Sequence, residues 1–318
     1  MESKIYFFEV ESNEKAAILK NYPQAICFEE AFSAKFLKRC SDAEILCGFI
    51  HSDFSGENLK RLPKLKLLIT RSAGFDHIDL VAAQKLRIAV CNVADYGSHV
   101  IAEHTFALLL AATRNIVEGN KRAKSCNFCY QGLCGKTLRG KTLGVVGVGK
   151  IGSKVCGIAS RGFGMEVIAF DKYPDAKLAK KFGFRHVKSL SEIWRKSDII
   201  TLHTPLTHET KHLINSKNIA QMKTGVILVN TARGSLIDTA ALVKAIKAGK
   251  FRKVALDVIE NEKNPKLDKV LLNLPEVIAT PHIAFYADTA KEKMYCAAFE
   301  SIEEFRKQRK LTHQIKST

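Results

Sequence analysis

The 318-residue sequence lacks the features that mark several special classes of protein. No apolar run approaches the roughly 18 to 20 residues that a membrane-spanning helix needs. The opening stretch, MESKIYFFEVESNEK, lacks the basic head, apolar run and cleavage site of a signal peptide. No internal repeat or low-complexity segment is evident. We therefore expect a cytoplasmic protein with no membrane partner.

The sequence is also not depleted in apolar residues, as disordered chains are. Hydrophobic residues make up 46% of the chain, and the mean hydropathy is close to zero, which is typical of a globular protein. The length exceeds that of most single compact domains and suits two.

The nine cysteines are odd in number and scattered along the chain, which indicates free thiols in a reducing compartment. Cys126, Cys129 and Cys134 form one cluster, in SCNFCYQGLC. A structural zinc site needs four ligands, and neither His nor Cys follows this cluster at a suitable spacing. The sequence favours a plain connecting loop here, and we expect no metal.

The net charge of +18 results from 50 Lys and Arg against 32 Asp and Glu. Nucleic-acid binding is one interpretation of such a charge. However, the basic residues are spread over the chain, with no long block and no interleaved aromatic residues. A basic surface that attracts an anionic substrate and cofactor explains the charge as well, and we expect no nucleic-acid partner.

The first part of the chain alternates short apolar runs with helical patterns. The runs expected as buried strands are KIYFFEV, QAICFE, AEILCGFI, LKLLIT and RIAVCNV. The segments between them have apolar residues at three- and four-residue spacing and are NEKAAILKN, SAKFLKRC, SGENLKRL and DLVAAQKL. Strands that alternate with helices predict a parallel sheet covered on both faces.

A long helix is expected from about Ser98 to Glu118, in HVIAEHTFALLLAATRNIVE. It is apolar on more than one face, so we expect it to be buried against a domain or a second subunit. At 1.5 Å per residue it would span roughly 30 Å. A polar loop should follow, from Gly119 to Arg139.

A second series of strands and helices comes next. The six expected strands lie in KTLGVVGVGKIG, MEVIAFD, DIITLHT, GVILVN, KVALDV and EVIAT, and they predict a doubly wound sheet. After Pro281 the chain reads as mostly helical, and we expect it to return to the first domain. The predicted domains are therefore residues 1–97 with 285–318, and residues 98–284 inserted between them.

The second domain opens with a glycine pattern, Gly147-Val148-Gly149-Lys150-Ile151-Gly152, that is typical of dinucleotide binding. The first glycine makes the tight turn, the second admits the pyrophosphate, and the third lets the helix pack on the strand. Asp171 ends the next strand, 19 residues after Gly152. A carboxylate there binds ribose hydroxyls and repels a 2′-phosphate, which favours NAD over NADP, although the adjacent Lys172 leaves room for NADP.

Three side chains that suit acid–base chemistry follow strands of the second domain. They are Arg233 in VNTARGSLID, Glu262 in ALDVIENE and His282 in IATPHIAFY. An Arg binds a carboxylate through its planar fork. A His donates a proton near neutral pH, and a neighbouring carboxylate keeps a His protonated. In an open α/β sheet the strand ends surround the ligand crevice.

Ordered motifs over nearly the whole chain resemble those of the D-isomer-specific 2-hydroxyacid dehydrogenases. They are RSAGFDHID, YGSHVIAEHTFALLLAATR, LRGKTLGVVGVGKIG, SDIITLHTPLTHETKHLI, MKTGVILVNTARGSLID, ALDVIENE and TPHIA. The resemblance implies an α/β fold of two doubly wound parallel-sheet domains: a Rossmann NAD-binding domain inserted into a flavodoxin-like catalytic domain, with a cleft between them. It also implies NAD as cofactor, a small 2-oxo or 2-hydroxy acid as substrate, and a homodimer formed through the long helix.

The resemblance also assigns catalytic roles. It implies that Arg233 binds the substrate carboxylate and carbonyl, that His282 is the acid/base, and that Glu262 is its partner. Glu260 lies two residues away, and the choice of Glu262 rests on the family motif, in which the catalytic carboxylate is the fifth residue after Asp257.

Binding residues carry over in the same way. The backbone at Ala73 and Gly74 resembles the family's carboxylate-binding loop. The implied NAD contacts outside the three glycines are Lys150, Ile151, Asp171, Thr204, Pro205, Thr210, Thr231, Ala232 and Asp257.

The remaining histidines near these motifs are interpreted as supporting residues. His104 lies on an apolar helix and is expected to be packed. His203 is expected to support the cofactor loop, and His77 to lie in a turn near the substrate loop.

Within the family, the run PHIAFYADTA is most similar to D-lactate dehydrogenases, as is Tyr96 in VADYGSH. By that pattern Phe285 and Tyr96 would wall a small apolar pocket suited to a methyl group, which predicts pyruvate reduction to D-lactate with NADH. The motif RSAGFDH differs from the sequence that lactate dehydrogenases usually have at this position. Glyoxylate, hydroxypyruvate or a branched 2-oxo acid therefore stay open as substrates, since one methylene changes preference by only about 1 to 3 kcal/mol.

Three other functions are alternatives. A formate dehydrogenase typically has Gln at the position of Glu262, and phosphite oxidation uses the same type of triad. An NAD-sensing binding protein, like the family's transcriptional co-repressors, is the alternative outside the enzymes; the intact Arg, Glu and His argue against it.

Overall fold

The computed structural model describes residues 3–315. The chain divides into two compact units. The first unit comprises Met1–Tyr96 and Asp288–Thr318, and the second unit comprises Gly97–Ala287. Both are built on a parallel sheet, and each is described by itself below.

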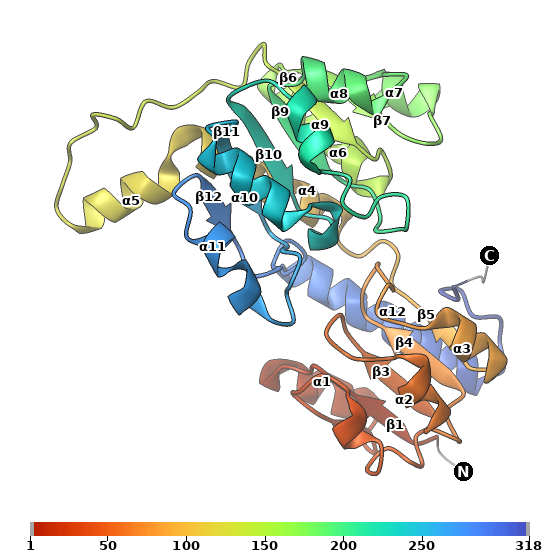
Figure 1. Cartoon of the computed structure of the whole chain (residues 1–318). Helices are drawn as coiled ribbons and strands as arrows, with labels where there is room; N and C mark the ends of the chain where they lie inside the picture. Colours follow the sequence, from red (N-terminus) through yellow and green to blue (C-terminus); the bar gives the residue numbers. More distant parts are fainter. Residues whose placement is uncertain (1–2, 316–318) are drawn as a thin grey trace. The chain divides into compact units, whose positions relative to one another are not determined.

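The first unit contains a five-stranded parallel sheet in the order β2-β1-β3-β4-β5. Figure 1 labels β1, β3, β4 and β5 of this sheet. All five strands lie inside the apolar runs predicted as strands. Their bounds are β1 Ile5–Phe7, β2 Ile26–Cys27, β3 Ile45–Gly48, β4 Leu67–Thr70 and β5 Ala89–Cys91. This strand order is that of flavodoxin-like doubly wound folds.

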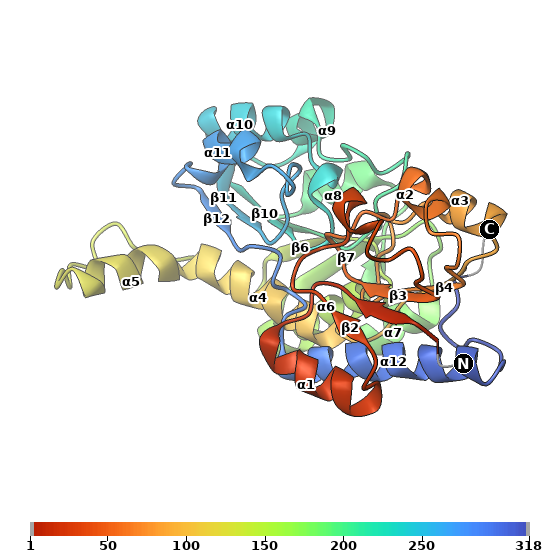
Figure 2. The same cartoon turned by 90° about the horizontal axis from the view of Figure 1, so that it is seen from below.

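Helices cover both faces of this sheet. On one face α1 (Ser12–Asn21) and α12 (Asp288–Arg306) bury their apolar residues against the strands, and Figure 2 shows the two helices on the same side. On the other face lie α2 (Gly56–Lys60) and α3 (Leu80–Lys85) with a cluster of phenylalanines. The return of the C-terminal helix to this sheet follows from its burial of Ala298 and Ile302.

The helix expected in SAKFLKRC is wrong. The segment forms only a single 3-10 turn, Ala34–Phe36. Phe36 is 3% exposed, and its ring centroid lies 4.8 Å from that of Phe28 and 5.0 Å from that of Phe8. Packing of this ring onto the sheet therefore overrides the local helical pattern.

The second unit contains a seven-stranded parallel sheet in the order β12-β11-β10-β9-β6-β7-β8. Five of its strands lie inside the predicted runs, and a sixth, β11, begins two residues before its run, KVALDV. Their bounds are β6 Thr142–Val146, β7 Glu166–Phe170, β9 Ile199–Leu202, β10 Val226–Asn230, β11 Phe251–Leu256 and β12 Val277–Ala279. The seventh, β8 (Arg185–His186), was not predicted because two polar residues leave no apolar run; it is held by pairing with β7.

Two layers of helices cover this sheet, as in a Rossmann domain (Figure 1). The layer on one face is formed by α4 (Ser98–Arg114) and α6 (Lys150–Gly157), which pack on each other. The layer on the other face contains α8 (Leu190–Lys196), α9 (Ser216–Gln221), α10 (Thr239–Lys247) and α11 (Lys269–Leu272). The predicted fold class, two doubly wound parallel-sheet domains, is confirmed.

The single continuous helix predicted from Ser98 to Glu118 is wrong at its C-terminal end. α4 ends at Arg114, and α5 (Ile116–Lys124) begins after a break at which the two axes differ by 66°. Asn115 occupies the break with a φ of 53°, a conformation that Asn tolerates better than most residues. The predicted burial holds for α4, which buries eight residues, whereas α5 buries none.

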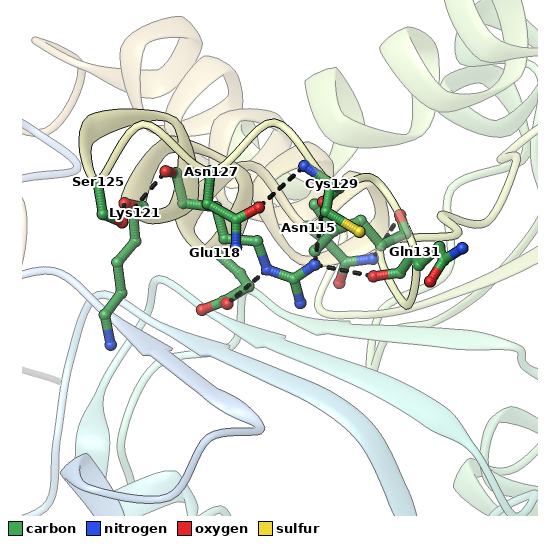
Figure 3. Close-up of polar contacts among 9 residues, drawn as sticks. Asn115, Glu118, Lys121, Ser125, Asn127, Cys129 and Gln131 are labelled. Carbon is green, nitrogen blue, oxygen red and sulfur yellow. Dashed lines mark hydrogen bonds and ion pairs between the residues drawn. The ribbon is translucent and has the colours of Figure 1, made fainter.

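The segment 116–136 extends away from the second-unit sheet (Figure 1). Its loop is organised by Arg122, whose guanidinium contacts Glu118 and the carbonyls of Cys129 and Gln131 (Figure 3). The predicted loop thus begins only after Lys124. The three clustered cysteines are exposed on it, and within residues 3–315 no group of side chains is arranged to hold a metal.

No single helix within residues 3–315 is long and apolar enough to cross a membrane. Among the described residues, only α4 and α5 taken together meet the length and composition of a span. In this structure they are a bent pair, and α4 is packed in the core of the second unit.

Candidate active site

The glycine-rich turn after β6 shows what each of its three glycines does. Gly147 has a φ of 89°, and a Cβ there would lie 2.7 Å from the backbone of His203. A Cβ at Gly152 would lie 2.0 Å from the Gly147 carbonyl oxygen. A Cβ at Gly149 would meet nothing within 4 Å. The chain itself therefore requires two of the glycines, and the space above the third is open to a ligand.

Asp171 lies at this turn, as its position after β7 predicted. One carboxylate oxygen accepts a hydrogen bond from the Val148 N–H at 2.6 Å, and the other accepts from the Tyr173 N–H at 2.9 Å. Helix α6 begins at Lys150, with Ile151 in its first turn. A glycine turn, a helix N-terminus and a carboxylate are the parts that bind the pyrophosphate and ribose of a dinucleotide. The residues present therefore fit NAD.

Lys172, the residue that left room for NADP, extends along the surface. Its ammonium lies 3.1 Å from a carboxylate oxygen of Glu209, and a hydrogen bond to that carboxylate raises the pKa of Lys172. Because the Glu209 carboxylate lies beside it, the Lys172 ammonium attracts a 2′-phosphate less strongly than an unpaired ammonium would.

Strand order reverses between β6 and β9, which is where doubly wound sheets bind their ligands. Thr204 and Pro205 follow β9 at this point. The loop is closed by Thr210, whose hydroxyl donates to the Pro205 carbonyl and accepts from the Thr207 N–H, both at 2.7 Å. Thr210 therefore holds the loop together from within.

His203 is packed under this loop. Its Nε2 lies 2.9 Å from the Thr201 hydroxyl, and burial lowers the pKa of His203 to about 3. A ring that stays neutral at physiological pH suits a supporting residue, as the sequence indicated.

The turn after β10 presents Arg233. Asn230 is fully buried; its side-chain oxygen accepts from the Ala232 N–H at 3.0 Å, and its side-chain nitrogen donates to the Arg233 carbonyl at 2.9 Å. The Thr231 hydroxyl lies 3.0 Å from that of Thr105 on α4. Sequence reasoning missed Asn230, although an Asn that ends a run of buried apolar residues is a detectable signal.

The three predicted catalytic residues follow three neighbouring strands. β10, β11 and β12 pair in register, with Asn230 opposite Leu256 and Leu256 opposite Ala279. The turn after β10 also touches the loop after β11, because a Cβ on Gly234 would lie 1.9 Å from the Ile259 carbonyl oxygen. The segments that carry Arg233, Glu262 and His282 therefore share one edge of the sheet.

Glu262 and His282 are in direct contact. The His282 Nδ1 lies 2.9 Å from a Glu262 carboxylate oxygen, and both side chains are partly exposed, at 20% and 28% respectively. Since this contact occupies Nδ1, Nε2 is the ring nitrogen left to exchange a proton with a substrate. His282 has a φ of 54°, an uncommon conformation that tends to occur at functional sites.

The buried carboxylate of Asp257 fixes the His282 turn. Asp257 is 1% exposed, and its oxygens accept from the Thr280 hydroxyl at 2.6 Å, the Ile283 N–H at 2.9 Å and the Ala284 N–H at 2.8 Å. Burial alone would raise the pKa of Asp257, but hydrogen bonds from His104, Thr280 and the two amides outweigh it and hold the pKa below its usual range. His104 is therefore a packed supporting residue, as expected.

Glu260 points to different partners. One oxygen lies 2.5 Å from the His212 Nε2, and the other accepts from the Thr239 N–H at 3.1 Å. Within the described chain, Glu262 is thus the carboxylate that contacts His282, which agrees with the choice that the family motif implied.

The residues expected to line the substrate pocket fall in both units. Ala73 and Gly74 lie in the turn between β4 and α3 of the first unit. Tyr96 ends the first segment of that unit and is 6% exposed. Phe285 belongs to the second unit, where its ring packs edge-on to His282 with centroids 6.2 Å apart.

The bonds to Asp257 predict a pH-dependent stability effect. A carboxyl whose pKa is lowered by folding stabilises the fold above its unfolded pKa of about 3.9, and this contribution is lost as the pH falls through the lower, folded value. Asp257→Asn should therefore lower the free energy of unfolding by a constant amount from pH 7 to pH 5. The loss should shrink below about pH 4. Urea unfolding of both proteins across this range measures it, and an effect that grows toward low pH would contradict the assignment.

Comparisons with known proteins agree with this layout. Residues 106–284 match the family described as "D-isomer specific 2-hydroxyacid dehydrogenase, NAD binding domain". D-lactate dehydrogenase from Escherichia coli is 40% identical over 74% of this chain and 72% of that protein. An aromatic 2-oxoacid reductase from Clostridium sporogenes is 40% identical over 76% of both chains.

A solved structure gives the same result over nearly the whole length. The crystal structure of D-lactate dehydrogenase from Aquifex aeolicus, complexed with NAD and lactic acid, superimposes with a TM-score of 0.89. It is 34% identical in sequence, and the match covers 96% of each chain. The protein therefore belongs to the D-isomer specific 2-hydroxyacid dehydrogenases, a family of NAD-dependent oxidoreductases.

Proposed function

We propose that the protein reduces pyruvate to D-lactate with NADH, reversibly. The contact between Glu262 and His282, on the same sheet edge as the Arg233 turn, is the observation that carries the proposal. The similarity to D-lactate dehydrogenases from two organisms supports pyruvate as the substrate.

NAD supplies and accepts the hydride when it is bound. We infer that residues 98–284 form the domain that holds it, with the adenosine ribose on Asp171 and the pyrophosphate at the start of α6. The remaining contacts proposed for NAD are Gly147, Gly149, Gly152, Lys150, Ile151, Thr204, Pro205, Thr210, Thr231, Ala232 and Asp257. Of these, Thr210 and Asp257 already bond to their own loops, so they shape the site as much as they touch the cofactor.

The protein's own groups perform the remaining steps. Arg233 binds the carboxylate and the carbonyl oxygen of the 2-oxo acid and stabilises the negative charge that grows on that oxygen. His282 donates the Nε2 proton to the oxygen, and takes it back in the reverse direction. Glu262, bonded to Nδ1, fixes the ring's orientation and stabilises its charged form.

Residues 1–97 with 285–318 are proposed as the catalytic domain. The substrate contacts proposed are the Ala73–Gly74 backbone, for the carboxylate, and Tyr96 in the first unit, and Phe285, which packs beside His282 in the second unit. A larger acid is the second candidate, because the aromatic 2-oxoacid reductase is as similar in sequence as the Escherichia coli enzyme. Glyoxylate, hydroxypyruvate and branched 2-oxo acids complete the range. We also propose that the protein is cytoplasmic and forms a homodimer. Light scattering would test the dimer.

A panel of acids tests the proposal directly. NADH oxidation, followed by absorbance with pyruvate, glyoxylate, hydroxypyruvate, 2-oxoisocaproate and phenylpyruvate, should give the highest kcat/KM with pyruvate. A preference for phenylpyruvate would replace the substrate but keep the reaction class. No turnover of any acid would refute the proposed function.

Arg233→Ala should lower kcat/KM for the preferred acid by about 10²- to 10⁴-fold, because a charge-assisted, two-point contact with the substrate is lost. Arg233→Lys should recover only part of this loss, since an ammonium lacks the planar fork. Steady-state kinetics measure both variants, and wild-type values in Arg233→Ala would show that the substrate binds elsewhere.

Glu262→Gln and Glu260→Gln form a matched pair of variants. Glu262→Gln should lower kcat by about 10²-fold with little change in the KM for NADH, because general acid catalysis depends on the ring that Glu262 holds. Glu260→Gln should cost much less, since Glu260 contacts His212 and Thr239 instead. The opposite order would exchange the roles of the two carboxylates.

A further inference from the structure

The turn formed by residues 72–75, called the amide turn below, has an unusual pattern of hydrogen bonds. The four carbonyls of Ser72, Ala73, Gly74 and Phe75 each accept a hydrogen bond from another group of the first unit. The N–H groups of Ala73, Gly74 and Phe75 donate to no group within residues 3–315. Consecutive amides of this kind form a concave site for an anion.

Three separate donors set the direction of these amides. The Val93 N–H bonds to the Ser72 carbonyl at 3.0 Å, the Asn92 side chain to that of Ala73 at 2.8 Å, and the Ser72 hydroxyl to that of Gly74 at 2.6 Å. In a trans peptide the carbonyl and the following N–H point in opposite directions, and all these peptides are trans. Each bond therefore turns one N–H outward.

The bond from Ser72 belongs to a chain of side chains. The Ser72 hydroxyl lies 2.7 Å from that of Thr70, and the Thr70 hydroxyl lies 3.2 Å from the His77 Nε2. Thr70 is fully buried and Ser72 is 2% exposed, so solvent competes little with these contacts.

The direction of every bond in this chain follows from proton counting. The Gly74 carbonyl can only accept, so the single proton of Ser72 is used there. The Ser72–Thr70 contact must then use the proton of Thr70, and the Thr70–His77 contact must use a proton on the His77 Nε2. His77 therefore donates to Thr70, Thr70 to Ser72, and Ser72 to Gly74.

We propose that Thr70, Ser72 and His77 are positioning residues that orient the amide turn toward the substrate carboxylate, and that the Phe75 N–H is a donor to that carboxylate beside those of Ala73 and Gly74. The proposal rests on the proposed function and extends it. The three side chains act through the Gly74 carbonyl and do not touch the substrate.

The effect should appear as a selective change in substrate binding. Ser72→Ala removes the donor to Gly74 and should raise the KM for the 2-oxo acid by about three- to tenfold, the range expected for one buried hydrogen bond. The KM for NADH should stay within about twofold of the wild-type value, because the cofactor residues lie on other loops.

Further variants test the next two members of the hydrogen-bond series, Thr70 and His77. Thr70→Val keeps the volume of a fully buried side chain but removes its proton, and should raise the same KM by a smaller factor; Thr70→Ser should restore it. His77→Gln retains a donor and should stay near the wild-type value, whereas His77→Leu should behave like Thr70→Val.

Ser301→Ala is the matched control. Ser301 is 1% exposed, lies in the same unit on α12, and bonds to the Ala297 carbonyl at 2.9 Å. Its removal should lower the melting temperature about as much as Ser72→Ala but leave the KM for the acid unchanged.

The titration of oxamate, an unreactive 2-oxo acid analogue, into each NADH-bound variant gives the dissociation constant directly. A parallel loss of oxamate affinity supports the proposal. An unchanged KM and affinity in Ser72→Ala, or an equal change in Ser301→Ala, would overturn it while leaving the proposed function standing. A wild-type protein that turned over no 2-oxo acid would overturn both.

Discussion

One buried carboxylate sustains the proposed catalytic edge of the second unit. Asp257 accepts hydrogen bonds from the backbone on the far side of His282 and from the Thr280 hydroxyl before it. An ionised group at that depth is stable only when donors surround it. The same donors hold the His282 backbone in a conformation that an isolated peptide would avoid, so the cost of burying the charge and the geometry of the acid/base residue are coupled.

The amide turn of the first unit and the glycine turn of the second also combine internal hydrogen bonds with backbone groups that are open to a ligand. In the amide turn, side chains bind the carbonyls and leave the N–H groups for a ligand. At the glycine turn, a carboxylate binds the Val148 N–H and stands where a ribose would bind. In each case, polar groups of the chain satisfy one side of the backbone, and the other side is left for an anionic or hydroxyl-bearing ligand.

The fold could be predicted from sequence to the level of strand content and class because short apolar runs that alternate with helical patterns indicate the buried strands of a parallel sheet. Two helix predictions were wrong because the local pattern does not decide them. The ring of Phe36 packs on the sheet and fixes a tight turn in place of a helix. Asn115, in a left-handed conformation, ends α4 although the apolar pattern continues beyond it. The glycine turn and its acid were predictable from spacing. Glu262 was chosen over Glu260 only through the family motif, and its contact with His282 agrees with that choice. The supporting roles of Asn230 and Ser72 were not predicted, because they depend on which side chains meet across loops.

The three glycines of the cofactor turn also separate two kinds of constraint. Side chains at the first and third positions collide with the protein's own backbone, whereas one at Gly149 projects into open space. A bulky residue at that single position could abolish dinucleotide affinity and leave the scaffold intact. The loss of cofactor binding and the loss of folding can therefore be separated at this one glycine.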